Sequence, residues 1–112
     1  MIIIKSDQIN ELPINVREFL ASDETSSIDT LITLSDDPEK SVILSLLNNK
    51  KIPIQLLIKF SDNIDEDIRK IVAENPLTPV DVIERLSNDS SSIVSESAKN
   101  NPSYVPIPVL VE

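Results

Sequence analysis

The side chains of this sequence that could do chemistry are almost all carboxylates and hydroxyls. The 112 residues include 19 Asp and Glu, but no His, no Cys and no Gly. The chain therefore offers no imidazole base, no thiol nucleophile and no nitrogen- or sulfur-ligated zinc site. It also has no glycine-rich phosphate loop. Because no serine stands in a pattern typical of a nucleophilic triad, we predict that the protein is not an enzyme and uses no cofactor.

The densest group of carboxylates lies between residues 62 and 67. It consists of Asp62, Asp65, Glu66 and Asp67. A calcium-binding loop needs oxygen ligands at alternate positions, a Gly at the sixth position and a Glu at the twelfth. Counted from Asp62, the sixth residue is Asp67 and the twelfth is Ala73. The spacing does not fit a calcium loop, and we predict no metal site.

An internal repeat explains these acids better. Asp36, Asp37 and Glu39 occupy the matching turn one repeat earlier, and Asp89 occupies the turn one repeat later. Each turn precedes an expected helix, where carboxylates accept hydrogen bonds from free backbone amides and favour the helix dipole. If the repeats stack, the turns also form one acidic edge that steers a basic partner. The residues of this predicted acidic edge are Asp36, Asp37, Asp62, Asp65, Glu66, Asp67 and Asp89.

The repeat has a period of 26 residues and runs without a gap from residue 16 to residue 101. Its apolar columns are Val16, Val42, Ile68 and Val94; Leu20, Leu46, Val72 and Ala98; Leu31, Leu57, Ile83 and Val109; and Leu34, Phe60 and Leu86. Its polar columns are Asp23, Asn49, Asn75 and Asn101; Ser35, Ser61 and Ser87; and Asp36, Asp62 and Asn88. Seven matched columns at one offset predict a repeat architecture in which neighbouring units bury each other's apolar faces.

Each unit is predicted to contain two short helices, most clearly in residues 64–89. Ile68, Ile71 and Val72 stand at positions i, i+3 and i+4, which is the apolar stripe of an amphipathic helix. Pro76 ends this helix, because the residue before a proline is pushed out of the α region.

The second helix of that unit is predicted to open at Thr78. Thr78 can cap it, Pro79 suits the first helical position, and Asp81 completes a capping box. The segment from Ser26 matches this opening in an earlier unit. Because the chain has no Gly, we expect Asn and Asp wherever a turn needs a left-handed residue.

The two ends of the chain differ from the repeats. Residues 2–4 and 105–111 are rich in β-branched residues, and we expect both ends to be extended segments that cap the stack. Pro106 and Pro108 exclude a central strand, although Pro106 could equally open a further helix. We therefore predict an all-α fold in a single domain, 1–112, with an N-terminal cap at 1–13. The units are predicted at 14–37, 38–63, 64–89 and 90–112, the last of them incomplete.

The third unit carries a motif that resembles the leucine-rich repeat variant family. It reads as an apolar helix ending in Asn75-Pro76, then Thr78-Pro79, then an apolar helix ending in Leu86-Ser87 before Asn88 and Asp89. Asn101-Pro102 repeats part of it, whereas Glu24 and Lys50 replace the first proline in the earlier units. The resemblance covers about 90 residues and implies a short right-handed α-solenoid, similar to HEAT and armadillo repeats. Some relatives carry an iron–sulfur cluster, which a chain without Cys cannot hold.

The charge balance points away from nucleic acids and anionic membranes as direct partners. The net charge is −9, so phosphates and anionic lipid surfaces repel the chain. The apolar run at residues 2–4 is too short for a signal-peptide core or a membrane span. We therefore expect a cytoplasmic protein that binds neither membranes nor nucleic acids directly.

Two functions remain open from the sequence. The first is a non-enzymatic protein–protein interaction module, a small scaffold or adaptor that binds a protein or peptide on its concave face or acidic edge. The alternative is an acidic inhibitor, of the immunity or DNA-mimic type, that occupies a basic nucleic-acid-binding surface. Homodimerisation through residues 2–4 or 105–111 is a further alternative that the sequence leaves open.

Overall fold

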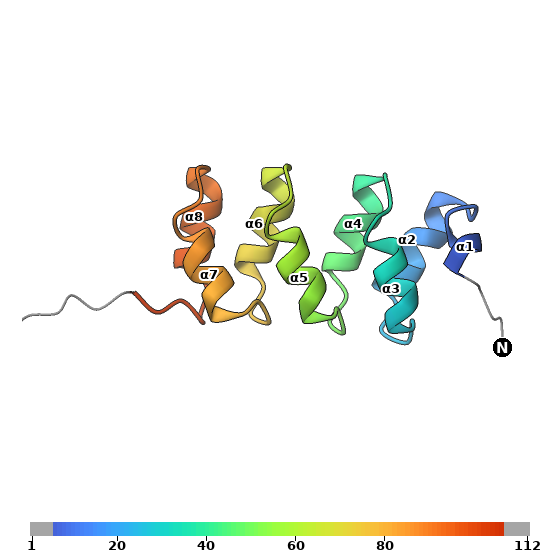
Figure 1. Ribbon diagram of the computed structural model, residues 1–112, viewed down its shortest axis with the longest axis horizontal. Coiled ribbons are helices and arrows are strands. Elements are labelled where there is room, and N and C mark those ends of the chain that lie inside the picture. Colours follow the sequence, from blue (N-terminus) through green and yellow to red (C-terminus); the bar gives the residue numbers. More distant parts are fainter. Residues whose placement is uncertain (1–5, 107–112) are drawn as a thin grey trace, which may run out of the picture. The chain divides into compact units, whose positions relative to one another are not determined.

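Every regular element in residues 6–106, the part of the chain that the computed structural model describes, is a helix. The helices are α1 (Ser6–Ile9), α2 (Ile14–Ser22), α3 (Ile28–Leu34), α4 (Lys40–Leu47), α5 (Ile54–Phe60), α6 (Glu66–Glu74), α7 (Val80–Leu86) and α8 (Ser92–Lys99) (Figure 1). This confirms the predicted all-α class. Two compact units divide the chain, and the division falls inside α5, between Leu56 and Leu57. The single-domain arrangement stays a prediction.

In the first unit, α2 and α4 pack against each other, and α3 contacts both of them. α1 packs against α3. The core between these helices consists of residues that are almost completely buried, chiefly Ala21, Leu31, Leu34, Val42 and Leu46. Full burial of one such Leu or Val side chain stabilises a fold by about 1.5–3 kcal/mol, so these contacts hold the short helices together.

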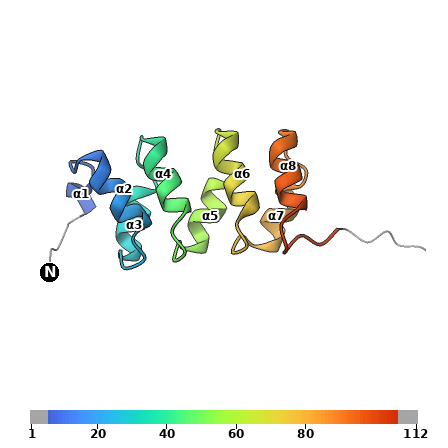
Figure 2. The same cartoon turned by 180° about the vertical axis from the view of Figure 1, so that it is seen from behind.

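The second unit repeats this arrangement with α6, α7 and α8. α6 and α8 pack side by side, as the view from behind shows (Figure 2), and α7 contacts both. Its core consists of Ile68, Val72, Ile83, Leu86, Val94 and Ala98. Phe60, at 2% exposure, is also buried, as its column predicted.

The apolar columns of the repeat account for most of the buried apolar residues in the described part of the chain. In the columns that begin with Leu31 and Leu34, every described member is at most 2% exposed. Val16 and Leu20 are partly exposed, whereas their counterparts in the later units are buried. Val109 lies outside the described residues.

The turns do not use left-handed residues, which corrects one expectation. Within residues 6–106 no residue has a positive φ. Asp23 and Asn75, for example, end their helices at φ −78° and −76°. Each of these side chains instead accepts a hydrogen bond from the backbone N–H two residues later, through Oδ1. These turns are therefore closed by Asx hydrogen bonds, and they need no residue in the left-handed conformation.

The predicted cap at Thr78 is also wrong. The N-cap residue of α7 is Pro79, and no side chain caps it. Thr78 is 2% exposed, and its Oγ1 donates to the carbonyl of Val72, 2.7 Å away. Ser26 makes the same bond to Leu20, at 2.7 Å. The hydroxyl is therefore used to satisfy a carbonyl at the end of the preceding helix.

The expected extended N-terminal cap is wrong for residues 6–9, which form α1. Ile9 is completely buried, and this helical turn brings it to the core of the first unit. At the other end, residues 104–106 have no regular structure, and Val105 is 64% exposed. Residues 2–4 and 107–111, on which the rest of this expectation falls, lie outside the described part of the chain. None of the described helices is long and apolar enough to cross a membrane.

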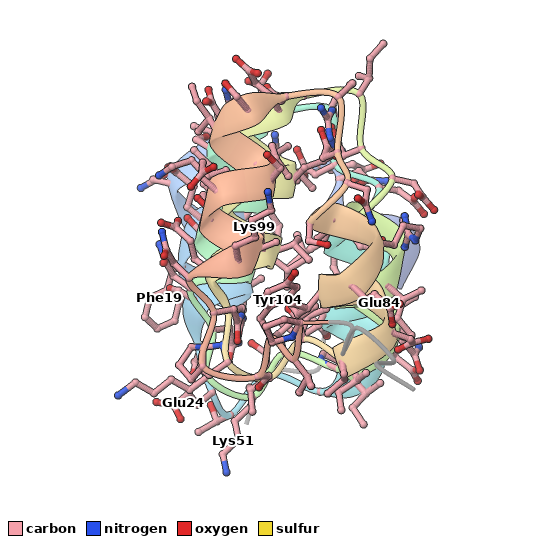
Figure 3. The ribbon with its side chains drawn as sticks, turned by 90° about the vertical axis from the view of Figure 1, so that its left-hand side faces the viewer. Phe19, Glu24, Lys51, Glu84, Lys99 and Tyr104 are labelled. Carbon is pink, nitrogen blue, oxygen red and sulfur yellow. The ribbon has the colours of Figure 1, made fainter. Side chains whose placement is uncertain are left out.

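Two aromatic residues lie nearer the surface. Phe19 of α2 is 63% exposed and points away from the ribbon (Figure 3). Tyr104 is partly buried.

The buried polar groups are hydrogen-bonded, since no buried side-chain nitrogen or oxygen of the described residues lacks a hydrogen-bond partner.

Candidate functional site: the acidic turn before α6

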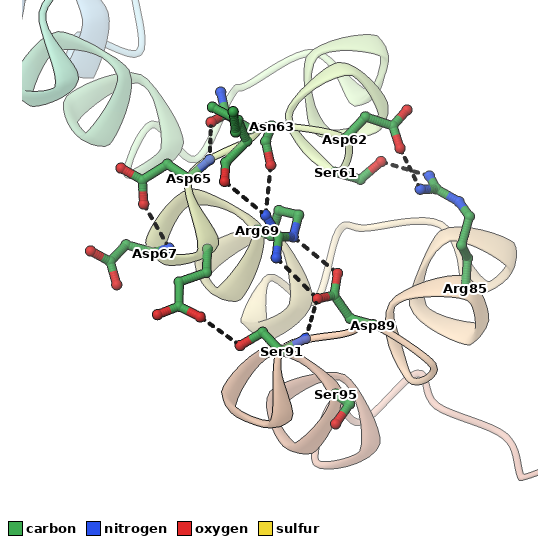
Figure 4. Close-up of polar contacts among 12 residues, drawn as sticks. Ser61, Asp62, Asn63, Asp65, Asp67, Arg69, Arg85, Asp89, Ser91 and Ser95 are labelled. Carbon is green, nitrogen blue, oxygen red and sulfur yellow. Dashed lines mark hydrogen bonds and ion pairs between the residues drawn. The ribbon is translucent and has the colours of Figure 1, made fainter.

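The turn between α5 and α6 brings four carboxylates together on a short stretch of backbone. Two Asx hydrogen bonds build it. Asn63 Oδ1 accepts from the N–H of Asp65 at 2.8 Å, and Asp65 Oδ1 accepts from the N–H of Asp67 at 2.8 Å (Figure 4). Asp65 is the N-cap residue of α6. The prediction that acids of this turn cap the helix is therefore confirmed for Asp65.

The side chain of Arg69 fixes the turn before α6 through hydrogen bonds to its backbone. Its Nη1 donates to the carbonyls of Asn63 and Ile64, at 2.8 and 3.1 Å. Its Nε and Nη2 donate to the two carboxylate oxygens of Asp89, at 3.0 and 3.1 Å. The side chains of Arg69 and Asp89 are only 16% and 11% exposed. One guanidinium therefore ties the turn before α6 to the turn before α8, and the bidentate geometry fixes their relative orientation.

The ion pair shifts the pKa of both partners. The hydrogen bonds that Arg69 donates to Asp89 raise the pKa of Arg69, and this outweighs the opposing effect of burial. For Asp89, burial raises the pKa, but the hydrogen bonds from Arg69 and from the N–H of Ser91 outweigh it. The positive charges of Arg69 and Arg85 act in the same direction, so the pKa of Asp89 lies below its ordinary value of 3.8. Asp89 is therefore a charged partner at neutral pH.

The first unit contains a matching pair 52 residues earlier. Arg17 Nε donates to Asp37 Oδ2 at 2.8 Å, and Arg17 Nη1 donates to the carbonyl of Leu12 at 2.6 Å. The Asp37 side chain is completely buried. Asp37 Oδ1 also accepts from the N–H of Glu39, as Asp89 Oδ1 does from Ser91. Asp37 and Asp89, two of the seven residues predicted for the acidic edge, thus have largely buried carboxylates that pair with an arginine of the same unit.

Sequence reasoning missed the two arginines that make these pairs. The signal was present, because Arg17 and Asp37 are 20 residues apart and so are Arg69 and Asp89. The 26-residue repeat between them, residues 38–63, has Ile43 in the arginine column, and Ile43 is buried. The arginine therefore follows a 52-residue period, which a search at 26 residues does not reveal.

The remaining predicted residues lie nearer the solvent. The Asp62 side chain is 73% exposed and forms an ion pair with Arg85, at 2.6 Å between Oδ1 and Nη1. Glu66 Oε2 accepts from the hydroxyl of Ser91 at 2.8 Å and stays exposed. Asp67 and, in the first unit, Asp36 are exposed as well. In the second unit the structure thus brings Asp62, Asp65, Glu66 and Asp67 together on one turn.

An open hollow of about 550 Å³ lies beside this turn in the second unit. Asp62, Ile64, Arg69, Arg85, Asp89 and Ser90 contribute to its lining. Ile64 is 98% exposed, the highest value of any large apolar residue described. Among residues 6–106, no three acidic side chains lie close enough together to hold a metal ion. The hollow is therefore a polar surface feature with one apolar residue at its side.

Comparison of the chain with protein-family models, with curated proteins and with solved structures gave no match.

Proposed function

We propose that this protein is a non-enzymatic protein–protein interaction module, a small helical-repeat scaffold or adaptor of the cytoplasm. In this proposal its two-helix units stack as a short right-handed α-solenoid of the leucine-rich repeat variant type. The recurrence of side-chain hydrogen bonds supports the stacking. Asn49 Nδ2 donates to the carbonyls of Ala21 and Asp23, and Asn101 Nδ2 makes the same two bonds in the second unit. Stacked repeats of this kind commonly serve as binding surfaces.

One observation carries the functional part of the proposal: exposed carboxylates stand on a backbone that is already fixed. Asp62, Glu66 and Asp67 are exposed, whereas the backbone beneath them is held by Asn63 and Arg69. Binding to such a turn costs little conformational entropy, because the backbone is ordered before the partner arrives. With a net charge of −9, the partner favoured by electrostatics is a basic protein or peptide.

A pull-down with matched variants tests this function. The bait is the full chain, and bound proteins from a lysate of the source organism are washed over a salt series and identified by mass spectrometry. One variant carries Asp62→Asn, Glu66→Gln and Asp67→Asn. The control carries Asp81→Asn, Glu84→Gln and Glu96→Gln, which remove the same charge from exposed positions elsewhere in the second unit. Asp65 is left unchanged because it caps α6.

The expected result is a partner that the wild-type chain and the control retain and the turn variant loses. Loss from both variants, or from neither, would contradict a role for this turn. If no partner is retained by any bait, the interaction role itself is wrong. Circular dichroism of all three baits shows whether helicity is unchanged.

The salt series also addresses the alternative function. An acidic inhibitor that mimics DNA replaces many phosphate contacts at once, so its complex with a nucleic-acid-binding protein should weaken steeply with added salt. Competition by duplex DNA for the captured partner would support the inhibitor over the scaffold.

A further inference from the structure

We propose that residues 107–111, which lie outside the described part of the chain, fold back over an exposed apolar edge of the second unit. This apolar edge consists of the exposed residues Pro76, Leu77, Val80, Pro102 and Val105. The contact is independent of the interaction role proposed above, which concerns the acidic turn before α6. Three features support it: the hydrogen bonds that join the two turns of the edge, their lack of charge, and the composition of the segment that follows.

Two neighbouring turns of the second unit carry the apolar edge. Leu77 and Val80 lie where the chain passes from α6 to α7, and Val105 follows α8. These three side chains are 47%, 51% and 64% exposed. Asn101 joins the turns, because its Nδ2 donates to the carbonyl of Asn75 at 3.0 Å. The exposed apolar side chains therefore stand on backbone that is held together.

The two turns have the same construction up to the point where the chain leaves the second one. The N–H of Thr78 donates to the carbonyl of Asn75 at 3.1 Å, and the N–H of Tyr104 donates to the carbonyl of Asn101 at 2.9 Å. The first turn leads into α7, whereas residues 104–106 have no regular structure. The segment after Pro106 thus starts at the apolar edge itself.

The apolar edge lies in uncharged sequence. Residues 75–80 and 100–111 contain no Asp, Glu, Lys or Arg, although 26% of the whole chain is charged. The matching turns of the first unit carry Glu24, Lys50 and Lys51, all of them exposed. Covering such charges is costly, whereas an uncharged edge can be covered without desolvating an ion. At these positions the apolar residues thus occur in the unit that leads into residues 107–111.

The segment itself has the composition and the length to cover the edge. Residues 107–111 read Ile-Pro-Val-Leu-Val. Five extended residues span about 17 Å, and packed helices lie about 8–10 Å apart, so the segment can reach from Pro106 to Leu77. Because it is covalently attached, its effective concentration at the edge is of millimolar order. Even a weak apolar contact is therefore populated.

A second copy of the chain is the less favourable occupant. Two copies would bring net charges of −9 together, and this repulsion opposes association. Residues 107–111 carry no charge and meet no such barrier. Exposed apolar patches on soluble proteins commonly mark contact sites, and here the segment of matching character is the one attached to the patch.

Paramagnetic relaxation in the ¹⁵N-labelled full chain tests the contact. Because the sequence has no Cys, Glu112→Cys accepts a single nitroxide label beside the segment without replacing any of its apolar residues. The amide signals of Leu77, Thr78 and Val80 should lose intensity relative to the sample with the reduced label. The signals at matching positions of the first unit, Thr25 and Ile28, should keep theirs.

Variants of the labelled chain show whether the contact is apolar. Leu110→Ser should lower the ratio of docked to free segment about tenfold or more, because one buried apolar side chain is lost. Leu77→Ser, on the edge, should also reduce the intensity loss at Thr78 and Val80. The control is Ile93→Ser, at a position 51% exposed at the start of α8, and it should change nothing. Leu77 and Ile93 lie at the surface, so both variants keep the fold, which circular dichroism checks.

Tyr104 provides a second measurement without a label. It is the single Tyr of the sequence, which has no Trp, so tyrosine fluorescence reports on this one ring beside the apolar edge. Acrylamide is an uncharged quencher, and the net charge of the chain does not repel it. Leu110→Ser should increase the quenching of Tyr104, whereas Ile93→Ser should leave it unchanged. Equal quenching in all three chains would contradict the proposed cover.

Three results of the relaxation experiment would overturn the proposal. One is intensity loss confined to residues 100–111, next to the label in the sequence. Another is loss at Leu77 that Leu110→Ser leaves unchanged. The third comes from a mixture of spin-labelled ¹⁴N chain with unlabelled ¹⁵N chain: the same loss at Leu77 in this mixture would assign the apolar edge to a second copy. The pull-down with the acidic-turn variants is unaffected by any of these results.

Discussion

Asp and Asn side chains close the turns of this protein in the way that glycine does elsewhere. Within residues 6–106, eight of them accept a hydrogen bond through Oδ1 from the N–H two residues later: Asp23, Asp37, Asn49, Asn63, Asp65, Asn75, Asp89 and Asn101. The side-chain oxygen thus accepts a backbone N–H and closes the turn. Without such a side chain, a tight turn often needs a residue with positive φ. The amide nitrogens of Asn49 and Asn101 also donate hydrogen bonds to carbonyls at the end of an earlier helix, those of Ala21 and Asp23 and those of Ala73 and Asn75.

Asn101 offers a test at the scale of one residue. Asn101→Asp replaces an amide that donates to the carbonyls of Ala73 and Asn75 by a carboxylate that faces them. We expect a loss of about 2–4 kcal/mol in the free energy of unfolding at pH 7, because a buried charge faces two acceptors. The neighbouring Asn100 is exposed, and Asn100→Asp should cost less than about 1 kcal/mol. Urea unfolding followed by circular dichroism measures both, and equal losses would contradict the role assigned to the amide.

The pKa of Asp89 leads to a prediction about acid. Because this pKa is lowered in the fold, the stability that the charged group contributes is present above its ordinary value of 3.8. That contribution is lost as the pH falls through the folded value. Asp89→Asn should therefore destabilise the protein clearly at pH 7 and much less near pH 3. The exposed Asp81→Asn is the control, and a destabilisation by Asp89→Asn that does not change with pH would refute this account.

At the scale of helices and turns, the two kinds of Arg–Asp pair have different effects on stability. Arg17→Met leaves the fully buried Asp37 carboxylate without its cation, which should cost about 3–5 kcal/mol. Arg85→Met breaks a pair whose side chains are 48% and 73% exposed, which should cost less than about 1 kcal/mol. Thermal unfolding of both variants makes the comparison. A second substitution, Asp37→Asn, should recover part of the loss in the first variant, and no recovery would mean that Arg17 acts through packing alone.

Helices could be predicted from the sequence better than the contacts that position them. The i, i+3, i+4 pattern of Ile68, Ile71 and Val72 correctly predicts α6, because periodic burial is a local property of the chain. The bond from Thr78 to the carbonyl of Val72 and the ion pair between Arg69 and Asp89 could not be predicted in the same way. Both depend on which groups meet after the helices pack. For the same reason the exposed and buried acids of the turns could not be told apart.

At the scale of the whole molecule, the arginine pairs recur after 52 residues, which is twice the 26-residue period of the sequence. Arg17 and Asp37, Asn49 and its two carbonyls, and Ser26 with Leu20 all recur at that distance. If the units stack as proposed, inserting a second copy of residues 38–89 after residue 89 preserves every such contact. The extended chain should show greater helical ellipticity in proportion to its length and still unfold cooperatively. A molten or aggregated product would contradict the stacked arrangement.

The residue that follows each of these asparagines also determines whether its side chain can deamidate. An asparagine deamidates when the N–H of the next residue attacks its side-chain amide, and a proline has no N–H to do so. Asn75 and Asn101 are each followed by proline, whereas Asn49 is followed by Lys50. Chemical conversion of a column asparagine to aspartate is thus open in the first unit and closed at the two prolines of the second. Stored protein should therefore lose the hydrogen bonds that Asn49 makes to Ala21 and Asp23 before it loses the matching bonds of Asn101 to Ala73 and Asn75.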